Sequence, residues 1–160
     1  MWTAEQLRAI NEDGNLLVSA AAGAGKTAVI TERIARIIAS GTDVSEILVV
    51  TFTNPAAAEM KQRIERRLSE LAESTDDTKL KMHLHDSAIN ISTANISTIH
   101  SFCGNVLRRN CHIVGLDPAL PQRLHCCALK HWMMYWKRHI RMRKKLRIRI
   151  FACFVTPYSR

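Results

Sequence analysis

Residues 20–27 read Ala-Ala-Ala-Gly-Ala-Gly-Lys-Thr, a run whose residue types suit the binding of phosphate groups. Glycine and alanine allow consecutive backbone N–H groups to turn inward around phosphate oxygens. The ammonium of Lys26 would neutralise the β and γ phosphates of a nucleotide, and the hydroxyl of Thr27 would hold Mg²⁺. The residues that we assign to this phosphate loop are Ala20, Ala22, Gly23, Ala24, Gly25, Lys26 and Thr27.

The flanking sequence places the phosphate loop between a strand and a helix, which is the setting that such a loop requires. The first position is Ala20, where the general pattern has glycine. The structural alternative is an Ala/Gly-rich loop that only packs closely against a sheet. The adjacent Gly-Lys-Thr favours phosphate binding, because the N-terminus of the following helix adds unpaired N–H groups and the positive end of its dipole.

The elements that must position this loop follow from hydrophobic periodicity. Short apolar runs predict buried strands over residues 15–20, 47–52 and 95–98. Helices are expected over residues 3–11, 26–39, 55–71, 80–88 and 100–110. Alternation of strands with helices predicts an α/β fold, a P-loop domain with a parallel sheet and flanking helices.

Two further segments carry polar side chains where a predicted strand passes into a helix. Thr53 and Asn54 follow one strand, and His100 and Ser101 follow another. Their hydroxyl, amide and imidazole groups can donate hydrogen bonds to phosphates or bases. The structural alternative is a capped helix start, since Thr, Ser and Asn favour such positions.

The whole series, in its order and spacing, resembles superfamily 1 DNA helicases of the UvrD and Rep type. The phosphate loop is similar to their alanine-first version, and Trp2-Thr-Ala-Glu-Gln6 looks like their Q motif. Residues 51–60, Thr-Phe-Thr-Asn-Pro-Ala-Ala-Ala-Glu-Met, resemble helicase motif Ia, and residues 98–102 resemble their Thr-x-His-Ser-Phe segment. Residues 96–103 and the polar insert before them are most similar to the AddA family, which belongs to AddAB-type helicase–nucleases.

The resemblance implies a RecA-like domain that uses ATP and Mg²⁺. Gln6 would read the adenine, and Thr53, Asn54, His100 and Ser101 would contact single-stranded DNA. It also implies a parent enzyme that unwinds and degrades DNA ends during double-strand-break repair. The parent would work with the AddB partner of such a helicase/nuclease, in the bacterial cytoplasm and without a membrane.

Charge divides the chain at about residue 121. Residues 1–121 contain 12 Lys and Arg and all 14 acidic residues, whereas residues 122–160 contain the other 11 basic residues and no acid. We interpret 1–121 as the N-terminal part of the helicase domain and 122–160 as a basic tail outside the family. A one-base shift of the codons for residues 132–136 permits Asp-Asp-Val-Leu, so we hypothesise a change of reading frame near residues 120–123, which the coding DNA would test.

The same reasoning limits the activity expected of this chain alone. The second acidic motif of the family, an apolar strand ending in Asp-Glu, is not found, and Asp76-Asp77 follows a polar stretch. We therefore expect ATP binding with negligible hydrolysis. Two other classes remain as alternatives: a small P-loop enzyme such as a nucleotide kinase, and a basic nucleic-acid-binding protein that acts through its tail.

Other features of the sequence favour no additional chemistry. No stretch approaches the ~20 apolar residues of a membrane span. The five cysteines are odd in number and lack CxxC spacing, which indicates reduced thiols rather than a disulfide framework. His83 and His85 are two residues apart on a predicted helix, so they point to different faces and do not form a metal site.

Overall fold

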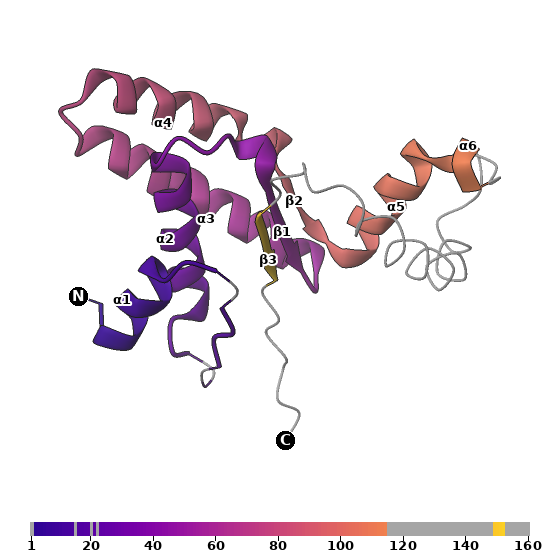
Figure 1. Cartoon of the computed structure of the whole chain (residues 1–160), viewed down its shortest axis with the longest axis horizontal. Coiled ribbons are helices and arrows are strands. Elements are labelled where there is room, and N and C mark those ends of the chain that lie inside the picture. The colour runs from indigo at the N-terminus through magenta and orange to yellow at the C-terminus, as the bar shows by residue number, and fades with distance from the viewer. Residues whose placement is uncertain (1, 15, 20, 22, 115–148, 153–160) are drawn as a thin grey trace.

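Three parallel strands form the sheet of the computed structural model, which describes residues 2–14, 16–19, 21, 23–114 and 149–152. The strands are β1 (Ile47–Thr51), β2 (Asn95–Thr98) and β3 (Arg149–Ala152), in the order β2-β1-β3 (Figure 1). Val49 of β1 is aligned with Ile96 on one side and Phe151 on the other. All residues of β1 are buried, which is the pattern of a parallel strand covered on both faces.

The helices follow the predicted apolar periodicity closely. Each predicted helix is confirmed, with ends that differ by at most about three residues, the usual uncertainty of helix boundaries. In chain order they are α1 (Ala4–Asn11), α2 (Lys26–Ala39), α3 (Asn54–Glu73), α4 (Thr78–Asn90), α5 (Ile99–Arg109) and the short α6 (Cys111–Val114), with 3₁₀ turns η1 (Val44–Glu46) and η2 (Ile91–Thr93).

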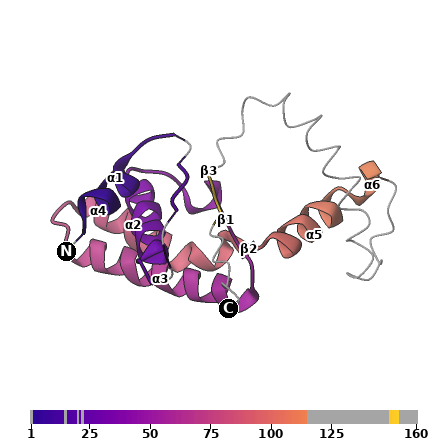
Figure 2. The ribbon, with the colours of Figure 1, turned by 90° about the horizontal axis from the view of Figure 1, so that it is seen from below.

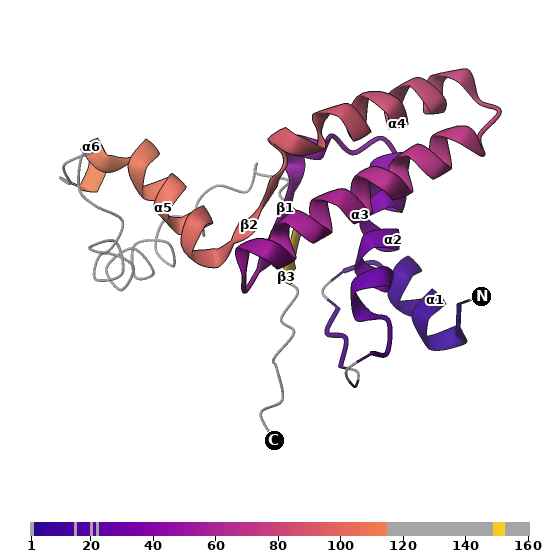
Figure 3. The ribbon, with the colours of Figure 1, turned by 180° about the vertical axis from the view of Figure 1, so that it is seen from behind.

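The hydrophobic core lies between the sheet and the helices α2, α3 and α4. Ile34 and Ile38 of α2 meet Ile64 and Leu68 of α3 in one buried cluster that also includes Val49 of β1. Helices α3 and α4 run as an antiparallel pair beside the sheet (Figure 3). Each fully buried aliphatic side chain of this kind contributes about 1.5–3 kcal/mol, so this cluster fixes how α2 and α3 lie relative to each other.

Helix α1 is held to α2 by polar contacts. The guanidinium of Arg33 donates to the carbonyl of Ala9 at 2.8 Å, and that of Arg36 donates to the amide oxygen of Asn11 at 2.8 Å. At the other end of α1, Thr3 forms a capping box with Gln6, as its predicted N-cap position requires. The N-terminal helix is therefore positioned at both ends before the chain reaches the phosphate loop.

The strand predicted over residues 15–20 is wrong. Residues 16–19 have no strand pairing, and the side chain of Leu17 is 95% exposed. A strand forms only where a neighbour supplies hydrogen bonds, and both edges of β1 are taken by β2 and β3. The apolar run therefore has no place beside β1 and passes over the surface on its way to α2.

Helix α5 leaves the body of the molecule at the end of β2. It packs against β2 and β1 and then runs away from α1–α4 towards α6, as seen from below in Figure 2. Within the described residues, no helix is long and apolar enough to cross a membrane.

The predicted tail, residues 122–160, lies mainly outside the described residues, and so does the proposed boundary at residue 121. The exception is β3, which adds four residues of that segment to the sheet beside β1. The division at residue 121 stays a prediction.

Candidate functional site

The phosphate loop lies at the start of α2, at the end of the molecule to which the carboxyl end of β1 points (Figure 1). Gly23 and Gly25 have positive φ angles of 81° and 77°, a conformation that costs glycine nothing and other residues strain. Gly25 is the N-cap of α2 and provides no side-chain acceptor for the first turn, which also contains no acidic residue. The amides at this helix start are thus suited to an anionic ligand.

Lys26 folds back over the loop. Its Nζ atom donates to the carbonyl of Ala21 at 2.7 Å, which places the ammonium above the turn that Gly23 and Gly25 form. The loop is closed from within by a 3.3 Å hydrogen bond from the amide of Ala24 to the same carbonyl. An ammonium at the mouth of a glycine turn and a helix start provides positive charge where phosphate oxygens would lie.

Gln6 connects α1 to the phosphate loop. Its Oε1 accepts from the amide of Thr3 at 2.9 Å, and its Nε2 donates to the carbonyl of Ala24 at 3.4 Å. A Cβ added at Gly25 would lie 3.3 Å from this Nε2, so the loop and the amide are in close contact. Gln6 is therefore beside the loop, as the sequence suggested, and its contact with adenine stays a prediction.

The two other small residues assigned to the loop, Ala20 and Ala22, lie outside the described residues. Thr27 is partly exposed in the first turn of α2, and its carbonyl accepts from the hydroxyl of Thr31 at 2.9 Å. Magnesium usually keeps several waters and takes its other ligands from substrate phosphates and one or two side chains, so the hydroxyl of Thr27 fits this ion. No group of three or more His, Cys, Asp or Glu that could hold a metal is found in the described part of the chain.

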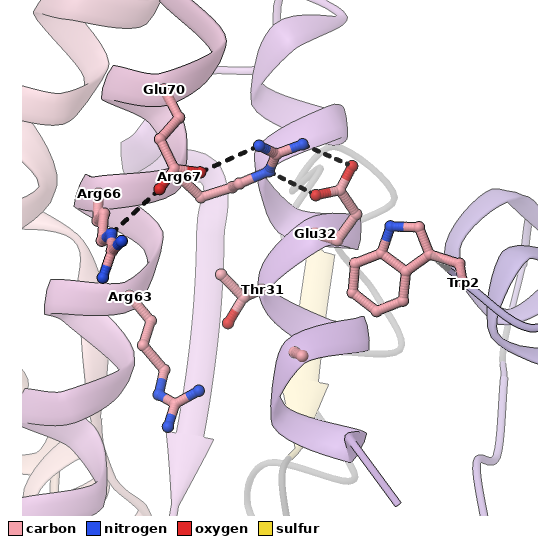
Figure 4. Close-up of a pocket in the computed structure, with 8 residues that line it drawn as sticks. Trp2, Thr31, Glu32, Arg63, Arg66, Arg67 and Glu70 are labelled. Carbon is pink, nitrogen blue, oxygen red and sulfur yellow. Dashed lines mark hydrogen bonds and ion pairs between the residues drawn. The ribbon is translucent and has the colours of Figure 1, made fainter.

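A pocket of about 460 Å³ opens beside the phosphate loop, and we call it the Trp2 pocket (Figure 4). The indole of Trp2 faces α2 across it, and Ala28, the residue after Thr27, begins its α2 wall. Its volume is in the usual range for small-molecule sites. The lining residues are Trp2, Ala28, Thr31, Glu32, Arg63, Arg66, Arg67 and Glu70.

One wall of the Trp2 pocket is an ion-pair network around Glu32. The residue is 3% exposed, and its carboxylate accepts from Arg67 Nε at 2.6 Å and Arg36 Nε at 2.9 Å. Burial alone raises the pKa of the Glu32 carboxyl, but the hydrogen bonds and charges of the two arginines outweigh it and leave the pKa below its ordinary value. Glu32 is therefore a buried anion that joins α2 to α3.

The arginines of α3 continue this network at the surface. Arg66 and Arg67 both pair with Glu70 at 3.1 Å, and Arg63 pairs with Glu59 at 2.6 Å. Sequence alone indicated a solvated face with local ion pairs, which these contacts confirm. It missed the link from Arg67 to Glu32 and the role of Trp2 as a pocket wall. A carboxylate within the apolar series of α2 was the available signal, because a charge on a core-facing helix must be paired.

The two polar strand ends predicted from the sequence lie side by side. Thr51 of β1 is aligned with Thr98 of β2, so the residues that follow each strand emerge at the same edge of the sheet. The side chains of Thr53, Asn54, His100 and Ser101 are all exposed there. We call residues 52–54 and 99–101 the strand-end segments.

Both structural alternatives for these segments are also real. Thr53 Oγ1 accepts from the amide of Ala56 at 3.3 Å and caps α3, and Thr98 Oγ1 accepts from the amide of Ser101 at 3.2 Å and caps α5. Capping uses Thr53 and Thr98 and leaves Asn54 and His100 exposed beside them. Phe52, predicted as the last strand residue, lies just beyond β1 and is 69% exposed. Contact of this edge with DNA stays a prediction.

The fold and the site define a class: an α/β P-loop nucleotide-binding domain, with a glycine turn and a lysine at the start of the helix α2. The sequence matches the family described as UvrD/REP helicase N-terminal domain over residues 2–152. The chain belongs to this family.

Similar proteins of this family include several bacterial proteins named as the AddA component of an ATP-dependent helicase/nuclease. The chain is 48% identical to that of Lactobacillus gasseri over 118 residues, 73% of this chain and 10% of the relative. It is 48% identical to that of Clostridium botulinum over 122 residues, 74% of this chain and 10% of the relative. It is 42% identical to that of Clostridioides difficile over 135 residues, 81% of this chain and 10% of the relative.

The chain is thus homologous to the N-terminal region of AddA, an ATP-dependent helicase/nuclease, and spans about a tenth of the length of these relatives. The family match ends at residue 152, beyond the boundary predicted at residue 121. Membership of a helicase family favours the helicase hypothesis over the nucleotide kinase and over a protein that acts only through its basic tail.

Proposed function

We propose that this chain binds Mg-ATP and contacts single-stranded DNA as the N-terminal part of an ATP-dependent DNA helicase. The observation that carries the proposal is the phosphate loop: two positive-φ glycines, an N-cap without a side chain and the ammonium of Lys26 converge at one helix start. Thr27 would hold Mg²⁺, which would screen the charge of the phosphates. Gln6, already in contact with the loop, would approach the base.

We further propose that the Trp2 pocket receives the nucleoside. It begins at Ala28, directly after the residues that would hold the phosphates, and it joins an aromatic wall to arginine side chains. An indole offers a flat apolar surface on which a base stacks, and guanidinium groups donate hydrogen bonds to ribose or phosphate oxygens. The phosphate loop and this pocket together would bind the two halves of ATP.

Replacing Trp2 with alanine is expected to weaken ATP binding about tenfold, because base–aromatic stacking contributes roughly 1–3 kcal/mol. Binding of inorganic tripolyphosphate, which has no base, should be unchanged. Trp2→Phe should recover most of the affinity for ATP. Isothermal titration of the full chain with both ligands measures this, and an equal loss for ATP and tripolyphosphate would place Trp2 outside the nucleoside site.

For DNA, the proposal rests on the strand-end segments, which are adjacent, exposed and free of acidic residues. The double substitution Asn54→Ala and His100→Ala is expected to weaken the binding of a fluorescent oligothymidylate roughly tenfold or more, since each lost hydrogen bond to a charged group is worth about 1.5–3 kcal/mol. Fluorescence anisotropy measures the affinity.

The matched control for that experiment is the double substitution Asn90→Ala and His85→Ala. It removes the same two residue types from exposed positions of α4. The control variant should bind DNA as the unchanged chain does, and both variants should keep their affinity for ATP. If the two double variants lose DNA binding equally, this edge of the sheet is not the DNA contact.

The names of the whole relatives describe an ATP-dependent helicase and nuclease. We propose for the parent of this chain the corresponding activity in double-strand-break repair, with the AddB partner of the helicase/nuclease, ATP, DNA and Mg²⁺, in the cytoplasm. ATP hydrolysis by this chain alone is expected to be negligible, because the closing of two lobes on the nucleotide completes the catalytic site in such motors.

A further inference from the structure

Helix α5 carries an exposed polar stripe that begins at the strand-end segments. Ser101, Asn105, Arg108 and His112 of α6 follow one another at spacings of three or four residues, which places them on one side of the helix. The opposite side contains the buried Cys103 and Leu107. The stripe is therefore the side of α5 that does not pack on the protein.

The charge of this stripe has one sign. From residue 87 to residue 116 the chain contains no acidic residue, so the basic groups of α5 have no carboxylate on their own helix. Arg108 lies along the stripe: its Nη2 donates to the amide oxygen of Asn105 at 2.9 Å and its Nε to the carbonyl of Gly104 at 3.4 Å. Its guanidinium thus lies back towards the strand-end segments rather than out from the tip of the helix.

Gly104 is a second, independent observation. It lies inside α5, where glycine is less favourable than alanine by about 1 kcal/mol. A Cβ at this position would meet nothing within 4 Å, so packing does not require glycine there. Its φ is not in the left-handed region either, because the positive-φ glycines described are Gly14, Gly23, Gly25 and Gly41. A glycine that neither packing nor backbone conformation requires suits the close approach of a ligand to the helix.

We propose that the single-stranded DNA backbone continues from the strand-end segments along α5, passing Gly104 and binding a phosphate at Arg108. This inference rests on the proposed function and extends it by one more phosphate site. From Ser101 to Arg108 the rise along the helix is about 11 Å, so the DNA must be long enough to reach both ends. The occupant is a nucleic acid strand because the stripe extends the edge that carries Asn54 and His100 and offers cations and amides without carboxylates.

The test is the affinity and salt dependence of the full chain for oligothymidylates of about four and about twelve nucleotides. Arg108→Gln should weaken binding of the longer oligonucleotide about tenfold and reduce the slope of log affinity against log salt by about 0.7, the contribution of one phosphate in a single strand. Binding of the shorter oligonucleotide should not change. Gly104→Ala should also weaken binding of the longer one while leaving the chain folded.

Arg109→Gln is the matched control, since it removes the same charge from the next residue, which points to a different side of α5. Equal effects of Arg108→Gln and Arg109→Gln would show general attraction by charge and overturn the proposal. If the Asn54 and His100 double variant loses DNA binding while Arg108→Gln binds normally, the path along α5 is wrong and the proposed function stands. If the unchanged chain binds no DNA, both fail.

Discussion

Replacing Lys26 with alanine is expected to weaken ATP binding by about 100-fold or more, the largest effect of any single substitution in the nucleotide site. A hydrogen bond between charged groups contributes about 1.5–3 kcal/mol, and here one ammonium would face more than one phosphate oxygen. The backbone turn of Gly23 and Gly25 would remain, so weak residual binding is expected rather than none. Titration of the chain with a fluorescent ATP analogue measures the change.

The protein should stay folded in this variant. The substitution removes the hydrogen bond from Lys26 to the exposed loop carbonyl of Ala21, and hydrogen bonds at exposed positions contribute little to stability. Lys79→Ala on α4 removes an exposed lysine distant from the loop and should bind ATP normally. An affinity of Lys26→Ala equal to that of Lys79→Ala would refute the phosphate site and with it the nucleotide half of the proposed function.

Substitution of Glu32 with alanine is expected to lower the free energy of unfolding by about 2–3 kcal/mol. Removing one partner of a buried ion pair costs about 3–5 kcal/mol, but the side chains of Arg36 and Arg67 are 44% and 34% exposed, so solvent screens part of the loss. The substitution leaves two guanidinium groups without their shared carboxylate at the junction of α2 and α3. Urea denaturation followed by circular dichroism measures the effect.

Glu70→Ala is the control for Glu32→Ala because it removes a carboxylate that also pairs with Arg67. The side chain of Glu70 is 45% exposed, and ion pairs that solvent reaches contribute little to stability. The two variants should therefore differ clearly in stability. Equal losses would mean that burial of Glu32 has no energetic consequence.

The same carboxylate predicts a direction for the pH dependence of stability. The pKa of Glu32 in the folded protein lies below its ordinary value of 4.5, because Arg67 and Arg36 outweigh the effect of burial. A depressed folded-state pKa gives stability that is present above the unfolded value and lost as the pH falls through the folded value. Melting temperatures should therefore decline below about pH 4.5 in the unchanged chain, with a smaller decline in Glu32→Gln.

The local elements of the site were predictable because each depends on neighbouring residues. Glycine at positions 23 and 25 allows the positive φ angles of the turn, and apolar residues at helical spacing specify α2 directly after it. The Thr3–Gln6 capping box and the caps Thr53 and Thr98 are likewise contacts over three residues. Hydrogen bonds of such short range form wherever the residue types and spacing permit them.

The strand predicted over residues 15–20 shows where this reasoning ends. Its apolar composition is suited to a buried strand, yet a strand also needs a free edge beside it, and composition contains no information about which edges are free. In the structure both edges of β1 are occupied, and Leu16, Leu17 and Val18 lie at the surface.

By itself, the sequence determined the phosphate loop, the order of helices and the two polar strand ends, all of which follow from residues close together in the chain. Only the tertiary structure decided that Trp2 faces Ala28 and Arg63 across one pocket, that Glu32 is buried between two arginines, and that α5 leaves the body with its polar stripe exposed. Those features depend on how whole helices pack, and the free energy of packing depends on surfaces that are separated in sequence and meet only in the folded chain.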